Sequence, residues 1–484
     1  MQKGYKRFGA ALLRIYNTLC APFYRLPAQS GYNALPGEII ENFNKSRLLG
    51  PQKKLCYAPF KMLYFAFNGE VVACCHNRRH ILGKIPDQRI DEIWQGDALK
   101  KLRDHIAHND LSLGCHICKD ALMAGNYDGA KNSYYDRYSV HAMPRIMEFE
   151  LDNRCNLSCI FCNDLFSSGH EKGLNEQNKN PYNDNFVKQL EPYIPYLKEA
   201  KFYGGEPFLI NIYYDIWALM IKLNPKIEIL IQTNGTILND RIKELLDKGR
   251  FNINISIDSI KKEPFEDIRK GASFEKVLEN VNYFQKYSVL HRRHLGIIPT
   301  PCRHNWKELP DITNWAGTLG AKVYFNTLVT PLEMALWNLP PETLEDIHTT
   351  LSQAKINQNT TIEKYNARHF SDFLKQLNGW RLKNEGVAAK KVPVTINELA
   401  AMKNSFLENI ENALGKETWD KHKSMVENLL AEVDSDRNKI LFYAVAVNIP
   451  IVDVTKEITK NEPVHLKEII MKRVFEASSQ FYLK

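Results

Sequence analysis

The chain has 484 residues, of which 64 are basic and 56 acidic, so its formal net charge is +8. Apolar residues make up 44% and charged residues 25%, a globular composition that excludes wholesale disorder. The length predicts two or three domains, and so mild a charge permits an anionic partner without requiring one.

The first predicted element is a leader, residues 1 to about 50, with one helical stretch. Its apolar run is broken by Arg14, Tyr16 and Asn17 and is too short to cross a bilayer. We find no secretory signal in it and no later run as long as a membrane helix. We therefore expect a cytoplasmic protein with no membrane span.

Residues 51–135 are predicted to form a small cysteine-rich domain. Eight of the ten cysteines in the chain fall between positions 56 and 162. In a large chain without an export signal, such clustering indicates ligands of a metal or cluster rather than a disulfide framework. Two strand-like runs, 61–67 and 71–74, flank the turn Asn68-Gly69, which predicts a β-hairpin.

Between residues 144 and 335 the pattern changes to strands that alternate with helices. The predicted strands are 146–151, 200–203, 227–232, 252–258, 295–299 and 322–326. This alternation predicts a parallel sheet, and six units are too few for a closed eight-fold barrel. The predicted fold class is therefore α/β, with a partial (open) parallel β/α barrel of about six units. Residues 341–484 are predicted to be mostly helical.

A cysteine motif follows the first strand of this region. Cys155, Cys159 and Cys162 have the spacing Cys-x3-Cys-x2-Cys. Three thiolates on one short loop can hold three irons of a 4Fe–4S cluster and leave the fourth iron open to a small molecule. The spacing alone also permits a zinc site completed by a histidine from elsewhere.

This motif resembles the hallmark of the radical S-adenosylmethionine (SAM) superfamily, with Phe161 as the aromatic residue before the third cysteine. Gly204, Gly205, Glu206 and Pro207, after the second strand, match the family's Gly-Gly-Glu-Pro motif. The resemblance implies that these residues hold the amino group of the methionine moiety of SAM. Physically, the two glycines allow close approach of backbone to a ligand, and Glu206 can pair with an ammonium.

Further residues match the family less specifically. Thr233 and Asn234 begin a Thr-Asn-Gly sequence at the end of the third strand, and Ser256 and Asp258 lie two apart on the fourth strand. The resemblance implies that Thr233 and Asn234 belong to the SAM-binding site, that Ser256 and Asp258 lie near the ribose and methionine of SAM, and that Arg269 contacts the methionine carboxylate. A simple turn at Asn234 and a surface ion pair at Arg269 remain open as alternatives.

The upstream cysteines resemble an auxiliary-cluster region, the SPASM domain or its shortened form, the twitch domain. The resemblance implies that Cys56, Cys74, Cys115 and Cys118 hold an auxiliary 4Fe–4S cluster. No cysteine lies between positions 119 and 154, which favours the shortened form. A four-cysteine zinc site, and Cys75 as a ligand in place of Cys74, remain open. In most relatives this region follows the radical domain, whereas here it precedes that domain.

The two isolated cysteines and the histidines near the upstream cysteines are not expected to be ligands. Cys20 and Cys302 stand alone and are predicted to be ordinary thiols. Five histidines near the upstream cysteines are expected at the surface: His76, His80, His105, His108 and His116.

The resemblance implies a radical SAM enzyme. Reductive cleavage of SAM at a 4Fe–4S cluster gives a 5′-deoxyadenosyl radical, which abstracts hydrogen from a peptide or small-molecule substrate, with the auxiliary cluster assisting. An external electron donor such as flavodoxin or ferredoxin is implied. Two alternatives remain, radical SAM modification of RNA and a non-catalytic, metal-stabilised binding scaffold. The sequence carries no RNA-binding appendage, so we do not expect nucleic acid as a partner.

Overall fold

The computed structural model describes residues 32–127, 129–162, 180–328, 331, 333–389, 396–431, 455 and 458. The predicted helical stretch of the leader and Cys20 lie outside the described residues. The chain divides into two compact units. The first comprises Met1–Leu339 with Asp346–Leu377, and the second comprises Pro340–Glu345 with Asn378–Lys484.

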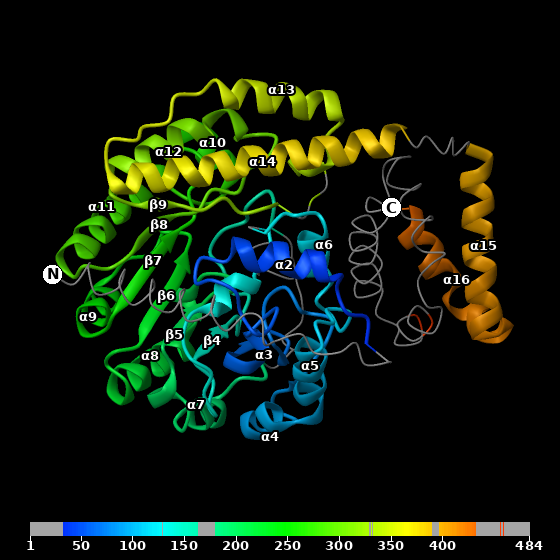
Figure 1. The fold of residues 1–484 in the computed structure, drawn as a ribbon, viewed down its shortest axis with the longest axis horizontal. Helices are drawn as coiled ribbons and strands as arrows, with labels where there is room; N and C mark the ends of the chain where they lie inside the picture. The colour runs from blue at the N-terminus through cyan, green and yellow to red at the C-terminus, as the bar shows by residue number, and fades with distance from the viewer. Residues whose placement is uncertain are drawn as a thin grey trace. The chain divides into compact units, whose positions relative to one another are not determined.

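The first unit is built on one sheet of nine strands in the order β3-β2-β1-β4-β5-β6-β7-β8-β9. Figure 1 shows β4 to β9 side by side in this order. Strands β4 to β9 are each parallel to their neighbours, which confirms the predicted open parallel barrel of about six units. The strands are β1 (Met62–Phe65), β2 (Glu70–Val72), β3 (Gly83–Lys84), β4 (Ile146–Phe149), β5 (Glu199–Phe202), β6 (Glu228–Thr233), β7 (Phe251–Ile255), β8 (Leu295–Ile297) and β9 (Lys322–Val323).

Helices connect the parallel strands, as the alternating pattern predicts. Asn183, Asn239 and Ser273 cap three of these helices by accepting from backbone N–H groups of the first turn, which otherwise lack partners. The connecting helices are α7 (Asp184–Leu190), α8 (Asn211–Leu223), α9 (Asp240–Lys248), α10 (Lys262–Ile268), α11 (Phe274–Leu290) and α12 (Leu309–Thr318).

The cysteine-rich segment shares this sheet. Its predicted hairpin is formed by β1 and β2, which pair antiparallel around Gly69. Strand β1 also pairs in parallel with β4, with Tyr64 opposite Glu148. Continuous hydrogen bonding therefore joins the segment to the first barrel strand. Helix α2 (Gly37–Ser46) precedes the segment. The helices of the segment itself are α3 (Ala58–Lys61), α4 (Ile90–Gln95), α5 (Asp97–Ala107) and α6 (His116–Met123).

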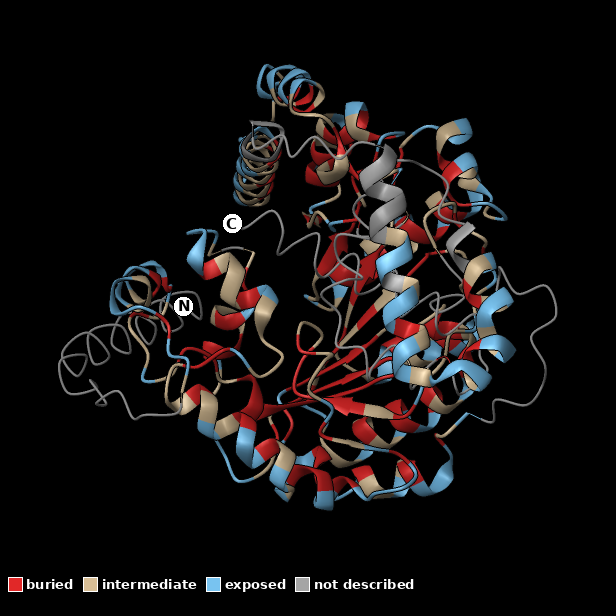
Figure 2. Cartoon of the chain, turned by 90° about the vertical axis from the view of Figure 1, so that its right-hand side faces the viewer, coloured by how far each residue is buried: buried red, intermediate tan, exposed pale blue. Residues whose placement is uncertain are grey.

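The two faces of the sheet differ in chemistry. On the face that packs against α8, Phe65, Phe149 and Phe202 stack in a row with ring centroids 5.4 and 4.8 Å apart. Because side chains alternate along a strand, the neighbouring residues point to the opposite, inner face. There the Lys201 ammonium pairs with the Glu148 carboxylate at 2.7 Å. The strands are predominantly buried, as Figure 2 shows in red.

The C-terminal part is helical where the structure describes it, as predicted. Its helices are α13 (Pro341–Ser352), α14 (Thr361–Ala389), α15 (Ile396–Leu414) and α16 (Lys416–Ala431). Within the first unit, Asn366 of α14 bonds the end strand: its Oδ1 accepts from Val323 N at 2.9 Å and its Nδ2 donates to Ala321 O at 3.0 Å. Among the described helices, none has the length and apolar character needed to cross a membrane.

Candidate functional site

The loop that carries Cys155, Cys159 and Cys162 begins after β4, at the carboxyl edge of the parallel sheet. It is held by backbone bonds from Ser158 N to Lys270 O and from Ile160 N to Ile268 O, both at 3.0 Å. The three thiols therefore lie on one anchored loop at the edge where functional groups of parallel β/α folds gather.

The Gly-Gly-Glu-Pro motif lies directly against this loop. The N–H of Glu206 donates to Arg154 O at 2.7 Å. Gly204 has a φ of +92°, which favours glycine. A Cβ at Gly205 would lie only 2.0 Å from Arg154 O. The glycines are therefore needed for the two loops to touch.

The carboxylate of Glu206 joins this motif to the Thr-Asn-Gly loop. It is fully buried and accepts from Thr233 Oγ1 at 2.8 Å, Asn234 N at 2.7 Å and Phe208 N at 3.2 Å. Burial raises the pKa of Glu206 to about 7 despite these donors. A cationic ligand at this position would favour the ionised carboxylate.

Asn234 then connects the Thr-Asn-Gly loop to the cysteine loop. Its Nδ2 donates to Asn156 Oδ1 at 3.0 Å and lies 3.8 Å from Cys155 Sγ. Asn156 in turn donates to Thr236 Oγ1 at 2.9 Å. Asn234 also forms a turn, because its Oδ1 accepts from Thr236 N at 2.9 Å, so it is both a turn residue and part of a side-chain network beside the first cysteine.

Asp258 and Arg269 form an ion pair of 2.6 Å next to the same loop. Both side chains are buried, so the alternative of a surface pair is wrong. Burial raises the pKa of the Cys159 thiol, and the Arg269 guanidinium partly offsets that rise. Arg269 thus places positive charge beside the cysteine loop.

The fourth barrel strand ends earlier than predicted. Strand β7 stops at Ile255, so Ser256 and Asp258 lie in the loop beyond it. Asp258 turns toward Arg269 and accepts from Thr300 N at 2.7 Å, which ends the strand geometry. Ser256 is half-buried, and its N–H donates to Thr233 O at 3.0 Å.

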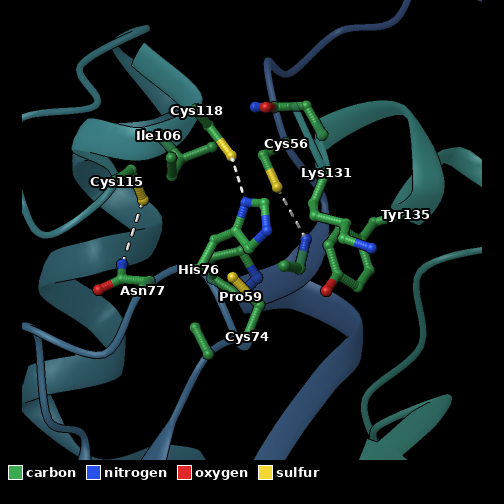
Figure 3. A pocket seen from close by; sticks show the side chains of 13 residues that line it. Cys56, Pro59, Cys74, His76, Asn77, Ile106, Cys115, Cys118, Lys131 and Tyr135 are labelled. Atoms are coloured by element: carbon green, nitrogen blue, oxygen red, sulfur yellow. Dashed lines mark hydrogen bonds between the residues drawn. The ribbon is translucent and has the colours of Figure 1, made fainter. Parts of the chain in front are cut away.

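A second group of cysteines lines a cavity in the upstream segment (Figure 3). Four cysteines surround this cavity: Cys56, Cys74, Cys115 and Cys118. The neighbouring Cys75 does not line it. Burial raises the pKa of all four thiols, that of Cys56 to about 12 and that of Cys118 to about 11. The structure therefore brings together the four cysteines that the resemblance implies.

Polar groups approach three of these sulfur atoms. Ala58 N donates to Cys56 Sγ at 3.4 Å, and Asn77 Nδ2 donates to Cys115 Sγ at 3.1 Å. His76 Nδ1 lies 3.7 Å from Cys118 Sγ, and Figure 3 shows its ring among the cysteines. The expectation of a surface residue is therefore wrong for His76.

Sequence reasoning missed several residues of this cavity, because no motif marks them. They are Pro59, Asn77, Ile106, Lys131, Asn132 and Tyr135.

The donor chemistry of both sites fits iron–sulfur clusters. Thiolates are the usual ligands of such clusters, and each site offers them from anchored positions. Three cysteines on the loop after β4 would leave one iron open, whereas four cysteines around the upstream cavity would complete a cluster. In the described part of the chain, no three His, Cys, Asp or Glu side chains are arranged to hold a single metal ion.

Comparison with known families agrees with this chemistry. Residues 150–316 match the Radical SAM superfamily, and residues 56–119 match the iron–sulfur cluster-binding SPASM domain. The chain therefore contains a radical SAM domain, and a SPASM domain lies on the N-terminal side of it. Its cofactors are accordingly a 4Fe–4S cluster, SAM and an auxiliary iron–sulfur cluster.

The curated relatives match only part of the chain. GTP 3′,8-cyclase of Clostridium perfringens is 27% identical over 175 residues, which are 35% of this chain and 51% of that protein. Probable GTP 3′,8-cyclase of Methanocaldococcus jannaschii is 25% identical over 186 residues, or 37% of this chain and 56% of that protein. The chain thus spans about half the length of the curated relatives it matches.

Two solved structures have a distant likeness. Native anSMEcpe with bound AdoMet has 20% identity and a TM-score of 0.35, and the match covers 43% of this chain and 58% of that one. Streptococcus suis SuiB bound to S-adenosylmethionine has 14% identity and a TM-score of 0.30, with 53% and 49% covered.

Proposed function

We propose that this chain cleaves SAM reductively and uses the resulting radical to abstract hydrogen from a polar peptide or small-molecule substrate. The observation that carries the proposal is the convergence of three motifs at one edge of the sheet. Glu206 bonds to Arg154 beside the cysteine loop, and Thr233 and Asn234 bond to Glu206.

Cys155, Cys159 and Cys162 are the proposed ligands of the radical-forming cluster. When bound, a 4Fe–4S cluster with an open iron supplies the electron that cleaves SAM to a 5′-deoxyadenosyl radical. Gly204 and Gly205 allow the backbone to approach the methionine moiety of SAM, and Pro207 fixes the turn that follows Glu206.

Charged and polar residues around this loop are the proposed SAM contacts. Glu206 supplies negative charge toward the methionine amine, and Arg269 supplies positive charge toward its carboxylate. Ser256 is proposed to face the ribose. Asp258 acts by holding the Arg269 guanidinium at 2.6 Å, which fixes where that positive charge lies.

Cys56, Cys74, Cys115 and Cys118 are the proposed ligands of the auxiliary cluster. Four protein thiolates leave no open iron, so this cluster is proposed to serve electron transfer rather than SAM binding. An external donor such as flavodoxin or ferredoxin would supply the electron for SAM cleavage.

The inner face of the sheet supports a polar substrate. Arg78 donates to Glu150 at 2.8 Å and to the Tyr64 hydroxyl at 2.6 Å, at the end of β4 where the cysteine loop begins. Glu148 and Lys201 form a further buried pair on the same face. An apolar substrate would displace water from these charged groups without offering them hydrogen bonds, which costs free energy. A substrate with amide, carboxylate or hydroxyl groups can hydrogen-bond to them instead. The relatives named GTP 3′,8-cyclase favour the small-molecule case.

Anaerobic reconstitution tests the proposal. Iron and sulfide are added under reducing conditions, and after reduction with dithionite the protein is incubated with SAM and 5′-deoxyadenosine is measured. We expect turnover by the parent protein and none by the variant in which Cys155, Cys159 and Cys162 are alanine. A loaded, reduced cluster that never cleaves SAM would contradict the proposal, and a colourless zinc protein would favour the binding scaffold.

A further inference from the structure

Asn77 is a buried amide whose orientation the surrounding bonds determine. Its side chain is 1% exposed. Its Nδ2 donates to Cys115 Sγ and to Leu113 O, both at 3.1 Å, while its Oδ1 accepts from His80 N at 3.2 Å. A reversed amide would set an oxygen against Leu113 O and an NH2 against the His80 N–H. The group that faces Cys115 is therefore an N–H donor.

The backbone around Asn77 is adapted to this contact. Gly114 has a φ of +76°, and a Cβ there would lie 2.1 Å from Asn77 Oδ1. The N–H of Asn77 also donates to Cys74 O at 3.1 Å. The residue is thus clamped between the backbone of one cavity cysteine and the sulfur of another.

A hydrogen bond to a cluster sulfur has a defined electronic effect. It stabilises negative charge on the thiolate, and the reduced cluster carries one more negative charge than the oxidised cluster. Donors to the sulfurs therefore raise the reduction potential. The contact of Asn77 with Cys115 is shorter than those of Ala58 N with Cys56 and His76 with Cys118, so it is expected to be the strongest of the three.

We propose that Asn77 is a positioning residue that raises the reduction potential of the auxiliary cluster through its bond to Cys115. The inference rests on the proposed function in one respect, that Cys115 is a ligand of this cluster. Beyond the proposed function, the reduction potential of the auxiliary cluster is then set in part by Asn77, a side chain that binds no iron.

The experiment is a redox titration monitored by electron paramagnetic resonance. It uses the full-length chain in a background with Cys155, Cys159 and Cys162 replaced by alanine, so that only the auxiliary cluster titrates. Asn77→Ala removes the donor, and Asn77→Asp replaces it with a negative oxygen. We expect a more negative midpoint potential for Asn77→Ala and a still more negative one for Asn77→Asp.

Asn224→Ala is the matched control. Like Asn77, Asn224 donates from its Nδ2 to two acceptors, but both are backbone carbonyls and neither is a cysteine sulfur: Ile194 O at 2.9 Å and Leu197 O at 2.8 Å. Its loss should lower stability without moving the potential. An unchanged potential in a fully loaded Asn77→Ala protein would overturn the inference.

If Asn77→Ala fails to assemble a cluster, Gly114→Ala provides a second test of whether the Asn77 amide raises the reduction potential. Its methyl group displaces the amide but leaves the donor in the chain, so a loaded protein with a lowered potential supports the inference. A wild-type potential, or no assembly in this variant either, would show that Asn77 is only structural. Absence of iron from the background protein itself would instead contradict the proposed function, because no auxiliary cluster would then be held.

Discussion

The backbone nitrogen of Glu206 donates to the carbonyl oxygen of Arg154 over 2.7 Å. This bond joins the loop after β5 to the residue that immediately precedes Cys155. The proposed SAM site therefore depends on how closely two backbone segments approach, in addition to the side chains they carry.

Gly205→Ala tests that approach. The added methyl would lie 2.0 Å from Arg154 O, so the two loops must separate. We expect at least a tenfold loss of SAM affinity, about 1.4 kcal/mol, in isothermal titration of the anaerobically reconstituted protein. Gly379→Ala in α14 is the control, because its Cβ would meet no atom within 4 Å and should add about 0.5–1 kcal/mol of stability. An unchanged affinity in Gly205→Ala would contradict the assignment.

Alanine variants of Cys74 and Cys75 distinguish the two neighbouring thiols. Of these two cysteines, Cys74 lines the upstream cavity and Cys75 does not. We expect about eight irons per chain in the parent and about four in Cys74→Ala, because one of two 4Fe–4S clusters is lost. Cys75→Ala should keep the parent iron content. Iron and sulfide analysis after reconstitution measures both, and equal losses in the two variants would refute the distinction.

Removing the Asn366 side chain should destabilise the end of the sheet. Its amide satisfies Val323 N and Ala321 O, which β9 would otherwise leave unpaired. We expect Asn366→Ala to lower the free energy of unfolding by about 1–3 kcal/mol in urea denaturation. Lys375→Ala, at an exposed position of the same helix, should change it by less than about 0.5 kcal/mol. Equal effects of the two substitutions would argue against this role.

His294 makes stability fall in mild acid. Burial, with a smaller contribution from Lys322, lowers the pKa of His294 from 6.5 to about 4. Below pH 6.5 the unfolded chain binds a proton that the folded chain does not bind, so stability falls until the pH nears 4. The loss is at most about 3 kcal/mol and less after allowance for partial exposure.

The corresponding experiment compares denaturant unfolding at pH 7.5 and pH 5. We expect His294→Gln to lose less stability between these values than the parent. His304→Gln, at an exposed position, should behave as the parent does. A parent-like pH dependence in His294→Gln would exclude this histidine as the source.

Much of the barrel could be predicted because its signals are local. Apolar runs separated by helical periodicity indicate β4 to β9 without tertiary information. The strand ends could not be predicted in this way. Strand β7 stops at Ile255, where Asp258 turns to Arg269, and β9 spans only Lys322–Val323 because its partner β8 ends at Ile297. These limits depend on contacts between segments distant in sequence.

The same distinction applies to the site. Cysteine spacing and the Gly-Gly-Glu-Pro motif are readable because each is one short stretch of chain. The amide of Asn77 contacts Cys115, 38 positions away, and no spacing rule marks it. The pairing of β1 with β4, which sets Tyr64 opposite Glu148, could likewise not be predicted from hydrophobic periodicity. The sequence of a single strand does not show whether it lies at the edge of a sheet or inside it.

The pairing of β1 with β4 also has a consequence during synthesis. Strand β1 leaves the ribosome some 80 residues before its partner β4 exists. Until then one edge of the upstream hairpin is an open template for other chains. Chaperone protection would shield the nascent protein during this interval, so the yield of intact protein in a heterologous host should depend on translation speed.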